Sequence, residues 1–346
     1  MANIIYSQSS GFANAAIGKM ETHIRMILEH ESDLLTKAGG TRDWLFNVEK
    51  SKHFAETIVA QNEFDTFVAT PEGGGAENDT ISETYKKIIQ HVEFMKEFHI
   101  TTKLMEDANY GVAADAKGRA ENFIRAYYKT MNKLCEYALA NATNASGTFS
   151  GTDIDMTSYD NLPLFHKSHK WGGGAKKTGT QPNYFYDTDG IADASAAEDI
   201  LSELAVKMRN VKDENGEAMG YTADTIILPG NLPRVERSIK KACGTEQASG
   251  GSSANYINTQ FGNWTLIVLP TWQASTDTFM LMSSEANRNL KGNMFFDRTP
   301  LTVRNWEDNH TGNYMCTGRC RFGVGFGTYK HIMLYQKGAA TNAVSL

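Results

Sequence analysis

The longest helical pattern in the chain covers residues 101–143 and contains no proline. Its apolar residues recur every three or four positions, which gathers them on one face of a helix. They are Ala116, Ala120, Phe123, Ile124, Tyr127, Tyr128, Met131, Leu134, Cys135 and Ala138. At a rise of about 1.5 Å per residue this helix would span about 60 Å, far more than the usual helix of about three turns. We therefore predict a long spine helix whose apolar face packs against a second layer.

A shorter helical pattern and a period-two pattern precede the spine helix. Residues 11–37 have apolar positions at helical spacing, and two glycines follow them to end the helix. Residues 64–70 and 92–100 alternate between apolar and polar side chains, and residues 71–79 form a Gly-rich polar tip. These features predict a long two-stranded arm. Because a hairpin of two strands is only marginally stable alone, we expect the arm to lie against another chain.

The pattern changes to that of an α/β domain after the spine helix. Helical spacing at residues 195–211 and 233–242 flanks a short apolar run at 225–228, which predicts a buried strand between two helices. Residues 244–255 (GTEQASGGSSAN) predict a loop. They do not match a phosphate-binding loop, because they lack its Lys-Ser/Thr ending and follow a helix instead of a strand.

Strand patterns dominate the C-terminal part. Residues 264–269 and 279–282 are expected to pair, and so are residues 294–297 and 301–306. The next strand alternates, and its apolar face consists of Tyr314, Cys316, Cys320, Phe322, Val324 and Phe326. Cys316 and Cys320 then act as small buried apolar residues, and their spacing is not that of a Cys-x-x-Cys zinc or redox pair.

The two apolar faces predict the architecture of this part of the chain. A helix laid on a twisted antiparallel sheet hides one face of each element. We therefore expect the spine helix to be buried along Phe123, Tyr127, Met131 and Leu134, against the strand that ends in Phe322, Val324 and Phe326.

The composition fits a folded protein of one large domain or two to three smaller ones. The chain has 346 residues, of which 41% are hydrophobic and 21% charged. The net charge of −6 argues against a strong sequence-independent grip on nucleic acid phosphates. Four cysteines fit a reducing compartment. The first 20 residues lack the basic start and apolar core of a signal peptide, and the apolar run at 266–269 is too short to cross a bilayer, so we expect no membrane association.

The strongest candidates for metal ligands are His166 and His169, which are three residues apart. Three glycines follow at once, and no Glu lies between the histidines as a zinc-protease base would. We therefore assign both histidines a structural role beside Phe165 and Trp171. A nucleophile elbow and a dinucleotide-binding glycine motif are absent from the sequence. We predict no catalytic, cofactor-binding or metal site; a soluble α/β enzyme with a triad assembled in space stays the alternative of another class.

Three stretches, taken with the order of the elements, resemble the HK97-fold major capsid protein of tailed bacteriophages. They are residues 100–110 (ITTKLMEDANY), residues 160–169 (DNLPLFHKSH) with Gly172–Gly174 and Asn183, and residues 318–332 (GRCRFGVGFGTYKHI). The resemblance implies an α+β, HK97-like capsid fold. Its parts would be an N-terminal arm (1–51), an extended β-hairpin called the E-loop (52–100), a P-domain with the spine helix (101–171), an α/β A-domain (172–290), and P-domain return strands with a C-terminal tail (291–346).

The resemblance also implies a function. Such proteins self-assemble as pentamers and hexamers into an icosahedral shell that encloses phage double-stranded DNA without sequence-specific binding. The expected location is the virion capsid, assembled in the bacterial host cytoplasm, with portal, decoration and scaffolding proteins as further partners. Only about fifty residues precede the arm, which implies a separate scaffolding protein or none. An encapsulin-type nanocompartment shell is the alternative within the same fold.

Overall fold

A computed structural model shows how these patterns fold. It describes residues 5–6, 15–61, 69–75, 83–101, 103, 111–171, 179–244 and 260–346. The chain divides into two compact units. Unit 1 contains Met1–Glu56, Gln90–Cys135 and Phe295–Val324, and unit 2 contains Thr57–Ile89, Glu136–Met294 and Gly325–Leu346. None of the helices within the described ranges is both long and apolar enough to cross a membrane.

The helices of unit 1 confirm the two helical patterns. They are α1 (Ala15–Ala38), α2 (Thr41–Leu45) and α4 (Gly111–Ala140), which passes into unit 2 at its end. The 30-residue helix α4 is the predicted spine helix, and it ends where the sequence indicates. The predicted entry of the spine helix at residues 102 and 104–110 lies outside the described residues.

The sheet of unit 1 corrects the predicted arm. Its strands run in the order β1 (Ile5–Tyr6), β14 (Asn293–Glu307), β15 (Tyr314–Phe326) and β5 (Val92–Ile100), and β2 (Asn47–Lys50) also pairs with β14. The run at 92–100 is therefore not a strand of the arm: β5 pairs antiparallel with β15, with Val92 opposite Phe322 and Ile100 opposite Tyr314. The pairing is favoured because both strands bury the same alternate positions, as the stacked rings of Phe94 and Phe322 show at 4.7 Å.

A second correction concerns β14. The sequence predicts two paired strands at 294–297 and 301–306, but one strand continues through Pro300. A proline removes only a single ladder hydrogen bond, and β14 is held by β15 on one side and by β1 and β2 on the other.

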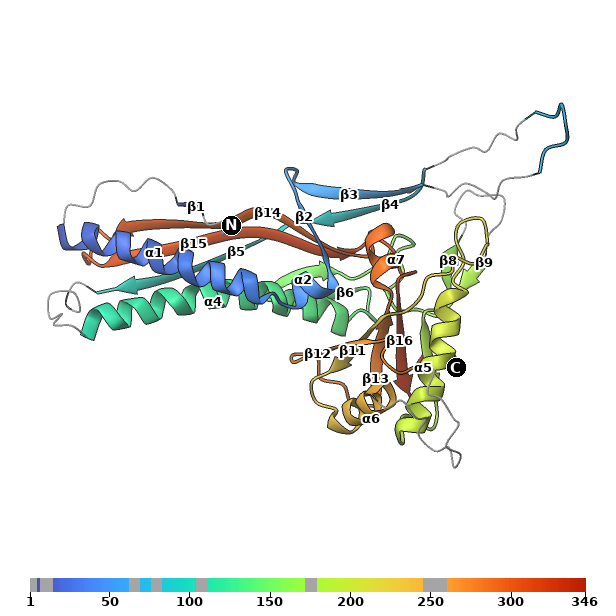
Figure 1. Cartoon of the computed structure of the whole chain (residues 1–346). Helices are drawn as coiled ribbons and strands as arrows, with labels where there is room; N and C mark the ends of the chain where they lie inside the picture. The colour runs from blue at the N-terminus through green and yellow to red at the C-terminus, as the bar shows by residue number, and fades with distance from the viewer. Residues whose placement is uncertain are drawn as a thin grey trace. The chain divides into compact units, whose positions relative to one another are not determined.

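The core of unit 1 lies between this sheet and the helices α1 and α4, which run alongside the long strands in Figure 1. Phe123 and Ile124 of α4 pack with Tyr314 and Cys316 of β15, and Ile24 and Leu28 of α1 join the same cluster. The buried face predicted for α4 is confirmed at Phe123, Met131 and Leu134, whereas Tyr127 is half-buried.

The helix also contacts the N-terminal half of β15, which was not predicted: a Cβ added at Gly318 would collide with the Phe123 ring. Phe322, in the C-terminal half, stacks with Phe94 and Phe295. Packing of the helix against Phe322, Val324 and Phe326 stays a prediction. Burial raises the pKa of the Cys316 thiol to about 12, in agreement with its predicted role as a small apolar residue.

Unit 2 has a six-stranded sheet in which β13 and β16 are the central strands. The strand order is β12 (Thr265–Leu269), β11 (Thr225–Pro229), β13 (Thr278–Met282), β16 (Ile332–Lys337), β10 (Tyr184–Asp187) and β17 (Val344–Ser345). The strands β12 and β13 were predicted to pair with each other, but both pair with β11, β12 in parallel and β13 antiparallel. All five residues of β11 are buried, and a strand buried in this way needs a neighbour on each side.

Helices α5 (Ala194–Arg209) and α6 (Pro233–Gly244) pack on one face of this sheet and confirm the predicted α/β pattern. Asp193 caps α5 by accepting a hydrogen bond from the Ala196 amide. A short helix, α7 (Ser284–Asn289), follows β13. Most of the predicted loop at 244–255 lies outside the described residues. The described residues also form three two-stranded sheets: β3 (Ala55–Gln61) with β4 (Glu83–Gln90), β6 (Ser146–Phe149) with β7 (Thr152–Asp155), and β8 (His169–Trp171) with β9 (Gly179–Gln181).

The packing of α4 gives a first prediction. Phe123→Ala removes a buried ring from the core of unit 1 and should cost about 3–5 kcal/mol of unfolding free energy. Lys129→Ala, on the exposed side of the same helix, should change stability by no more than about 0.5 kcal/mol. Thermal or urea melts of both variants check this, and greater damage from Lys129→Ala would contradict the assigned face.

Candidate functional site

The hairpin of β3 and β4 is the element that the sequence singled out for contact with other chains. Its root alternates: Ile58 and Ile89 are buried, whereas Val59 and Ile88 are exposed. Every residue at 69–75, in the Gly-rich tip, is exposed. Residues 64–68 of the predicted first strand and residues 76–79 of the predicted tip lie outside the described residues. The buried side of the root shows that this part of the arm rests on its own chain, contrary to the expectation that its support comes from another chain.

Alternate glycines at the end of β15 make room for the hairpin root. In unit 1, a Cβ at Gly323 would lie 2.7 Å from the carbonyl oxygen of Gln90. In unit 2, a Cβ at Gly325 would lie 2.7 Å from Ile89 Cδ1, and one at Gly327 would collide with the backbone of Lys291. Each of these three positions therefore excludes a side chain unless the adjacent segment of the same chain moves. The sequence contained this signal as alternate glycines within a strand, which often mark a close approach of two backbones.

A buried lysine holds the root of the hairpin within unit 2. Lys87 of β4 donates hydrogen bonds to Asp155 Oδ2 and to Thr157 Oγ1, both at 2.6 Å, and only 6% of its side chain is exposed. Partial burial of Asp155 opposes its ionisation, but the hydrogen bonds from Lys87 and Thr157 outweigh this effect and lower the pKa of Asp155. The ammonium group is thus paired in the folded chain. Sequence analysis did not identify this pair, because its members are 68 residues apart.

The two candidate histidines lie in a closely packed loop of unit 2. His169 is fully buried, and its ring stacks on that of Tyr329 at 3.9 Å. Its Nε2 is 3.0 Å from the Leu164 carbonyl oxygen and therefore donates to it, and its Nδ1 is hydrogen-bonded to Asp160 Oδ2 at 2.8 Å. Both ring nitrogens are engaged, which leaves no lone pair for a metal.

The neighbouring His166 has a different environment. Its Nδ1 accepts a hydrogen bond from the Ser168 amide at 3.1 Å, and burial followed by the nearby His169 lowers its pKa. Within the described ranges, no group of three or more His, Cys, Asp or Glu side chains is arranged to hold a metal ion. The contacts are those of structural histidines, and the absence of a metal site stays a prediction.

Asn183, which belongs to the second stretch that resembles capsid proteins, has a clear structural role. Its buried side chain donates to the carbonyl oxygens of Leu164 at 2.7 Å and Ile332 at 3.2 Å, and it accepts from the His166 amide at 2.9 Å. One amide therefore joins the histidine loop to β16. Few other side chains could do this, because a donor and an acceptor are needed at fixed positions.

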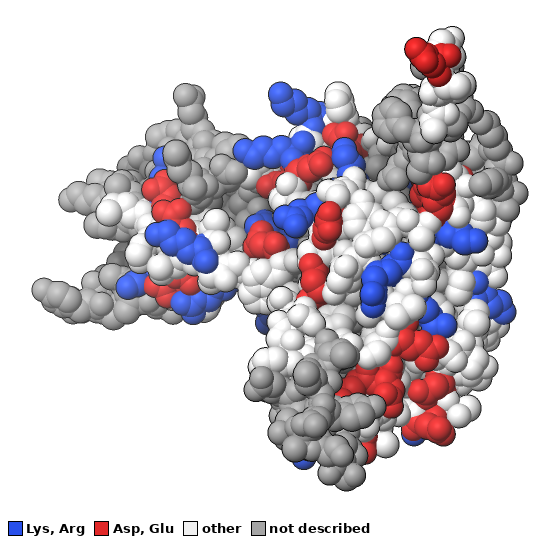
Figure 2. All heavy atoms as spheres, turned by 45° about the vertical axis from the view of Figure 1, so that its right-hand side comes forward, with Lys and Arg blue, Asp and Glu red and all other residues white. Residues whose placement is uncertain are grey.

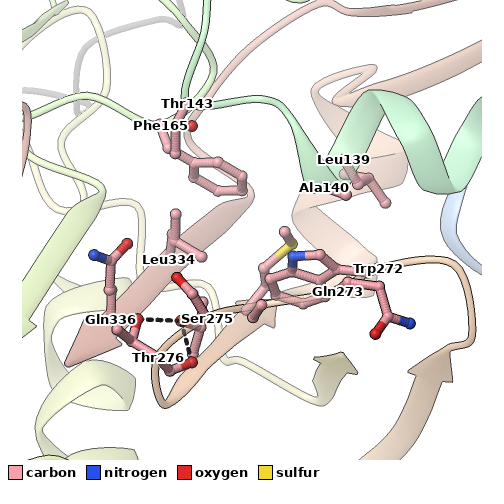
Figure 3. A pocket seen from close by; sticks show the side chains of 13 residues that line it. Leu139, Ala140, Thr143, Phe165, Trp272, Gln273, Ser275, Thr276, Leu334 and Gln336 are labelled. Atoms are coloured by element: carbon pink, nitrogen blue, oxygen red, sulfur yellow. Dashed lines mark hydrogen bonds between the residues drawn. The ribbon is translucent and has the colours of Figure 1, made fainter. Parts of the chain in front are cut away.

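The described part of unit 2 also contains a pocket of about 160 Å³ (Figure 3). It lies between the end of α4, the loop before β13 and the sheet, and Phe165, Trp272 and Leu334 form much of its apolar wall. Its polar groups are hydroxyls and amides; one of them, Gln336, accepts a hydrogen bond from Tyr184 at 2.6 Å. No charged residue lines it, so the pocket offers no strong acid or base for catalysis.

Among the comparisons with known proteins, only that with solved structures bears on the fold. No protein-family model matches the chain, and no curated protein sequence matches it. Among the similar solved structures is the capsid of the native GTA particle, with a TM-score of 0.51 and 12% identity over 96% of this chain and 94% of that chain. Another is the capsid of the cyanophage P-SCSP1u, with a TM-score of 0.50 and 12% identity over 86% of this chain and 87% of that chain. The predicted α+β, HK97-like capsid fold is confirmed.

The Lys87–Asp155 pair gives a second prediction. Asp155→Ala should cost about 1–3 kcal/mol, because it leaves a buried ammonium without its counter-charge. Lys87→Met should cost less, because the Asp155 side chain is already 56% exposed and can be hydrated. Urea unfolding at pH 7 measures both values, and the reverse order would contradict this account of the root.

The same pair predicts a pH dependence. A carboxylate with a lowered folded-state pKa contributes stability above its unfolded value of about 3.9. That contribution should be lost as the pH falls through the folded-state pKa. The stability difference between the wild type and Lys87→Met should therefore shrink in strong acid.

Proposed function

We propose that this chain, which has the fold of phage capsid proteins, is the major capsid protein of a tailed bacteriophage and self-assembles into an icosahedral shell around double-stranded DNA. The observation that carries the proposal is the likeness to capsid structures over almost the whole length of both chains. In this proposal pentamers and hexamers of the chain build the shell in the host cytoplasm. A separate scaffolding protein, a portal and decoration proteins are its further partners.

The hairpin supports self-assembly. A sheet of two strands is marginal alone, and the exposed side of this one carries Val59 and Ile88, which are 42% and 49% exposed. Phe54, just before β3, is 66% exposed. Apolar side chains on a projecting element are suited to burial against a second copy of the chain. We further propose that the intermolecular arm comprises the hairpin from β3 to β4 and ends before β5, which belongs to the sheet of unit 1.

The charge distribution supports a container for DNA. The chain has 34 basic and 40 acidic residues. On the face shown in Figure 2, outside the grey residues, the two kinds are interspersed. Tight nucleic acid binding needs many Lys and Arg side chains facing phosphates. An acidic, mixed surface instead suits a shell that encloses its genome without gripping it.

The alternatives have less support. An encapsulin-type shell would use the same fold, but the similar structures described above are capsids of a phage and of a GTA particle. An enzyme would need a reactive group in a pocket, whereas the pocket of unit 2 is lined by uncharged side chains and the buried ring of His169 is engaged at both nitrogens. We therefore propose a structural protein without catalytic activity.

Electron microscopy of the purified protein tests the proposed function. Closed shells of uniform size are expected, and particles from the host should contain double-stranded DNA. Shells filled with a protein cargo would support the nanocompartment instead. Small discrete particles that turn over a substrate would overturn the proposal.

A matched pair of variants tests the role of the hairpin. Val59→Asp with Ile88→Asp places two charges on its exposed side and should abolish shells while leaving the circular dichroism of the subunit unchanged. Val206→Asp, at a position 48% exposed on α5, is the control and should still form shells. Normal shells from the hairpin variant would show that this surface is not an assembly contact.

A further inference from the structure

The segment that joins β2 to β3 is tied to the start of β5 by a small polar network within unit 1. Ser51 Oγ lies 2.8 Å from Nε2 of His91 and donates a hydrogen bond to Glu56 Oε1 at 2.6 Å. The Ser51 amide donates to the carbonyl oxygen of Asp297 in β14 at 3.0 Å. Ser51 therefore fixes the backbone immediately before the hairpin.

The hydrogen-bond chemistry of this network determines the state of His91. An ionised Glu56 can only accept, so the Ser51 hydroxyl donates to it and the same oxygen accepts the proton on Nε2 of His91. The neutral ring then has its lone pair on Nδ1. That nitrogen is buried and has no hydrogen-bond partner among the described residues. A Cβ added at Gly323 would lie only 3.0 Å from this nitrogen, so the backbone of Gly323 is close to the ring.

The surroundings of the ring are unfavourable for a second proton. His91 is only 7% exposed. Burial is the main cause that lowers the pKa of His91, and the guanidinium groups of Arg298 in β14 and Arg321 in β15 lower it further. The carboxylate of Glu56 acts in the opposite direction and raises this pKa. Arg298 Nη1 and Arg321 Nε are buried and make no hydrogen bond to a described residue, and Arg321 Nε lies 3.8 Å from the carboxylate of Glu93, with which it forms an ion pair. The ring of Phe296, whose centroid is 6.3 Å from that of His91, supplies no charge.

We propose that Ser51, Glu56 and His91 form a latch at the root of the hairpin, which is closed while His91 is neutral and opens when His91 takes up a second proton. In the closed state the latch holds residues 51–56 on the sheet of unit 1. In the open state His91 is hydrated and separated from Arg298 and Arg321. The latch rests on the fold of unit 1 and does not depend on shell assembly.

The sign of the pH effect follows from these two states. The open state binds a proton with the ordinary pKa of about 6.5, and the closed state binds it less well. The closed latch is therefore fully stable above about pH 6.5 and weakens as the pH falls below that value. Because one proton is involved, the opening equilibrium can change by at most about tenfold per pH unit. Glu56 does not titrate in this range, because its hydrogen bond from Ser51 lowers its pKa.

Hydrogen exchange of the Ser51 amide in the full chain, between pH 7.5 and pH 5.5, tests the latch. After correction for the intrinsic pH dependence of exchange, opening should increase up to about tenfold per pH unit below pH 6.5. His91→Gln can still donate to Ser51 but cannot titrate, so the extra opening should vanish. The control is His99→Gln, an exposed position on β5, which should behave as the wild type. Ser51→Ala should raise opening by a similar factor at every pH.

Two results would overturn the latch. One is a wild-type amide whose corrected exchange does not change over the range, and the other is a pH dependence that persists in His91→Gln. If the variants fail to fold, an NMR titration of the His91 ring in the wild type decides the matter. A ring that titrates at or above its ordinary pKa would exclude the latch.

Discussion

The structure of unit 1 depends on how closely a helix and a sheet can approach each other. Phe123 of α4 fits against β15 only because position 318 is a glycine, and a methyl group there would collide with its ring. The same cluster includes Ile24 and Leu28 of α1, so side chains of α1, α4 and β15 pack together. Loss of such a ring leaves a cavity that a closely packed core cannot fill. The long helix is stable in this arrangement because one whole face of it is buried.

Glycines also allow the root of the hairpin to pack closely. Gly325 at the end of β15 adjoins Ile89, and Gly327 just after β15 adjoins Ile58, and both isoleucines are buried. The apolar contact is supplemented by the paired ammonium of Lys87. The hairpin is thus fixed at its root and exposed at its tip. An element of this kind can keep one position in the free subunit and still offer its exposed side to another copy.

In unit 2, buried polar side chains fix the position of one segment against another. Asn183 and His169 use all or nearly all of their hydrogen-bonding capacity to join a loop to the neighbouring strand and to Asp160. A polar side chain in the interior is stable only when its partners are satisfied, which makes such a network specific for one loop conformation. By contrast, His91 keeps an unsatisfied nitrogen beside two guanidinium groups. This contrast is the reason why His91, and not His169, is the histidine that we assign to a switch.

The sequence by itself determined the long helices and the buried faces of α4 and β15. Helical spacing identified α4 with its buried Phe123, and alternation identified the buried face of β15, because these periods reflect local backbone geometry. The order of the elements and three short stretches were sufficient to indicate the capsid fold. The sequence also raised His166 and His169 as candidates, but it did not indicate Asp160 or Tyr329 as their neighbours. The domain boundaries and the absence of metal and catalytic sites remain predictions.

Only the tertiary structure decided which strand pairs with which. The strand β5 was expected in the arm and pairs with β15, and β11 lies between two strands that were expected to pair with each other. A period of two reveals which side of a strand is buried, but it is the same for every possible partner. The pairing is selected by contacts between residues far apart in the chain, such as Phe94 with Phe322. Those contacts exist only after the chain has folded, so no local pattern contains them.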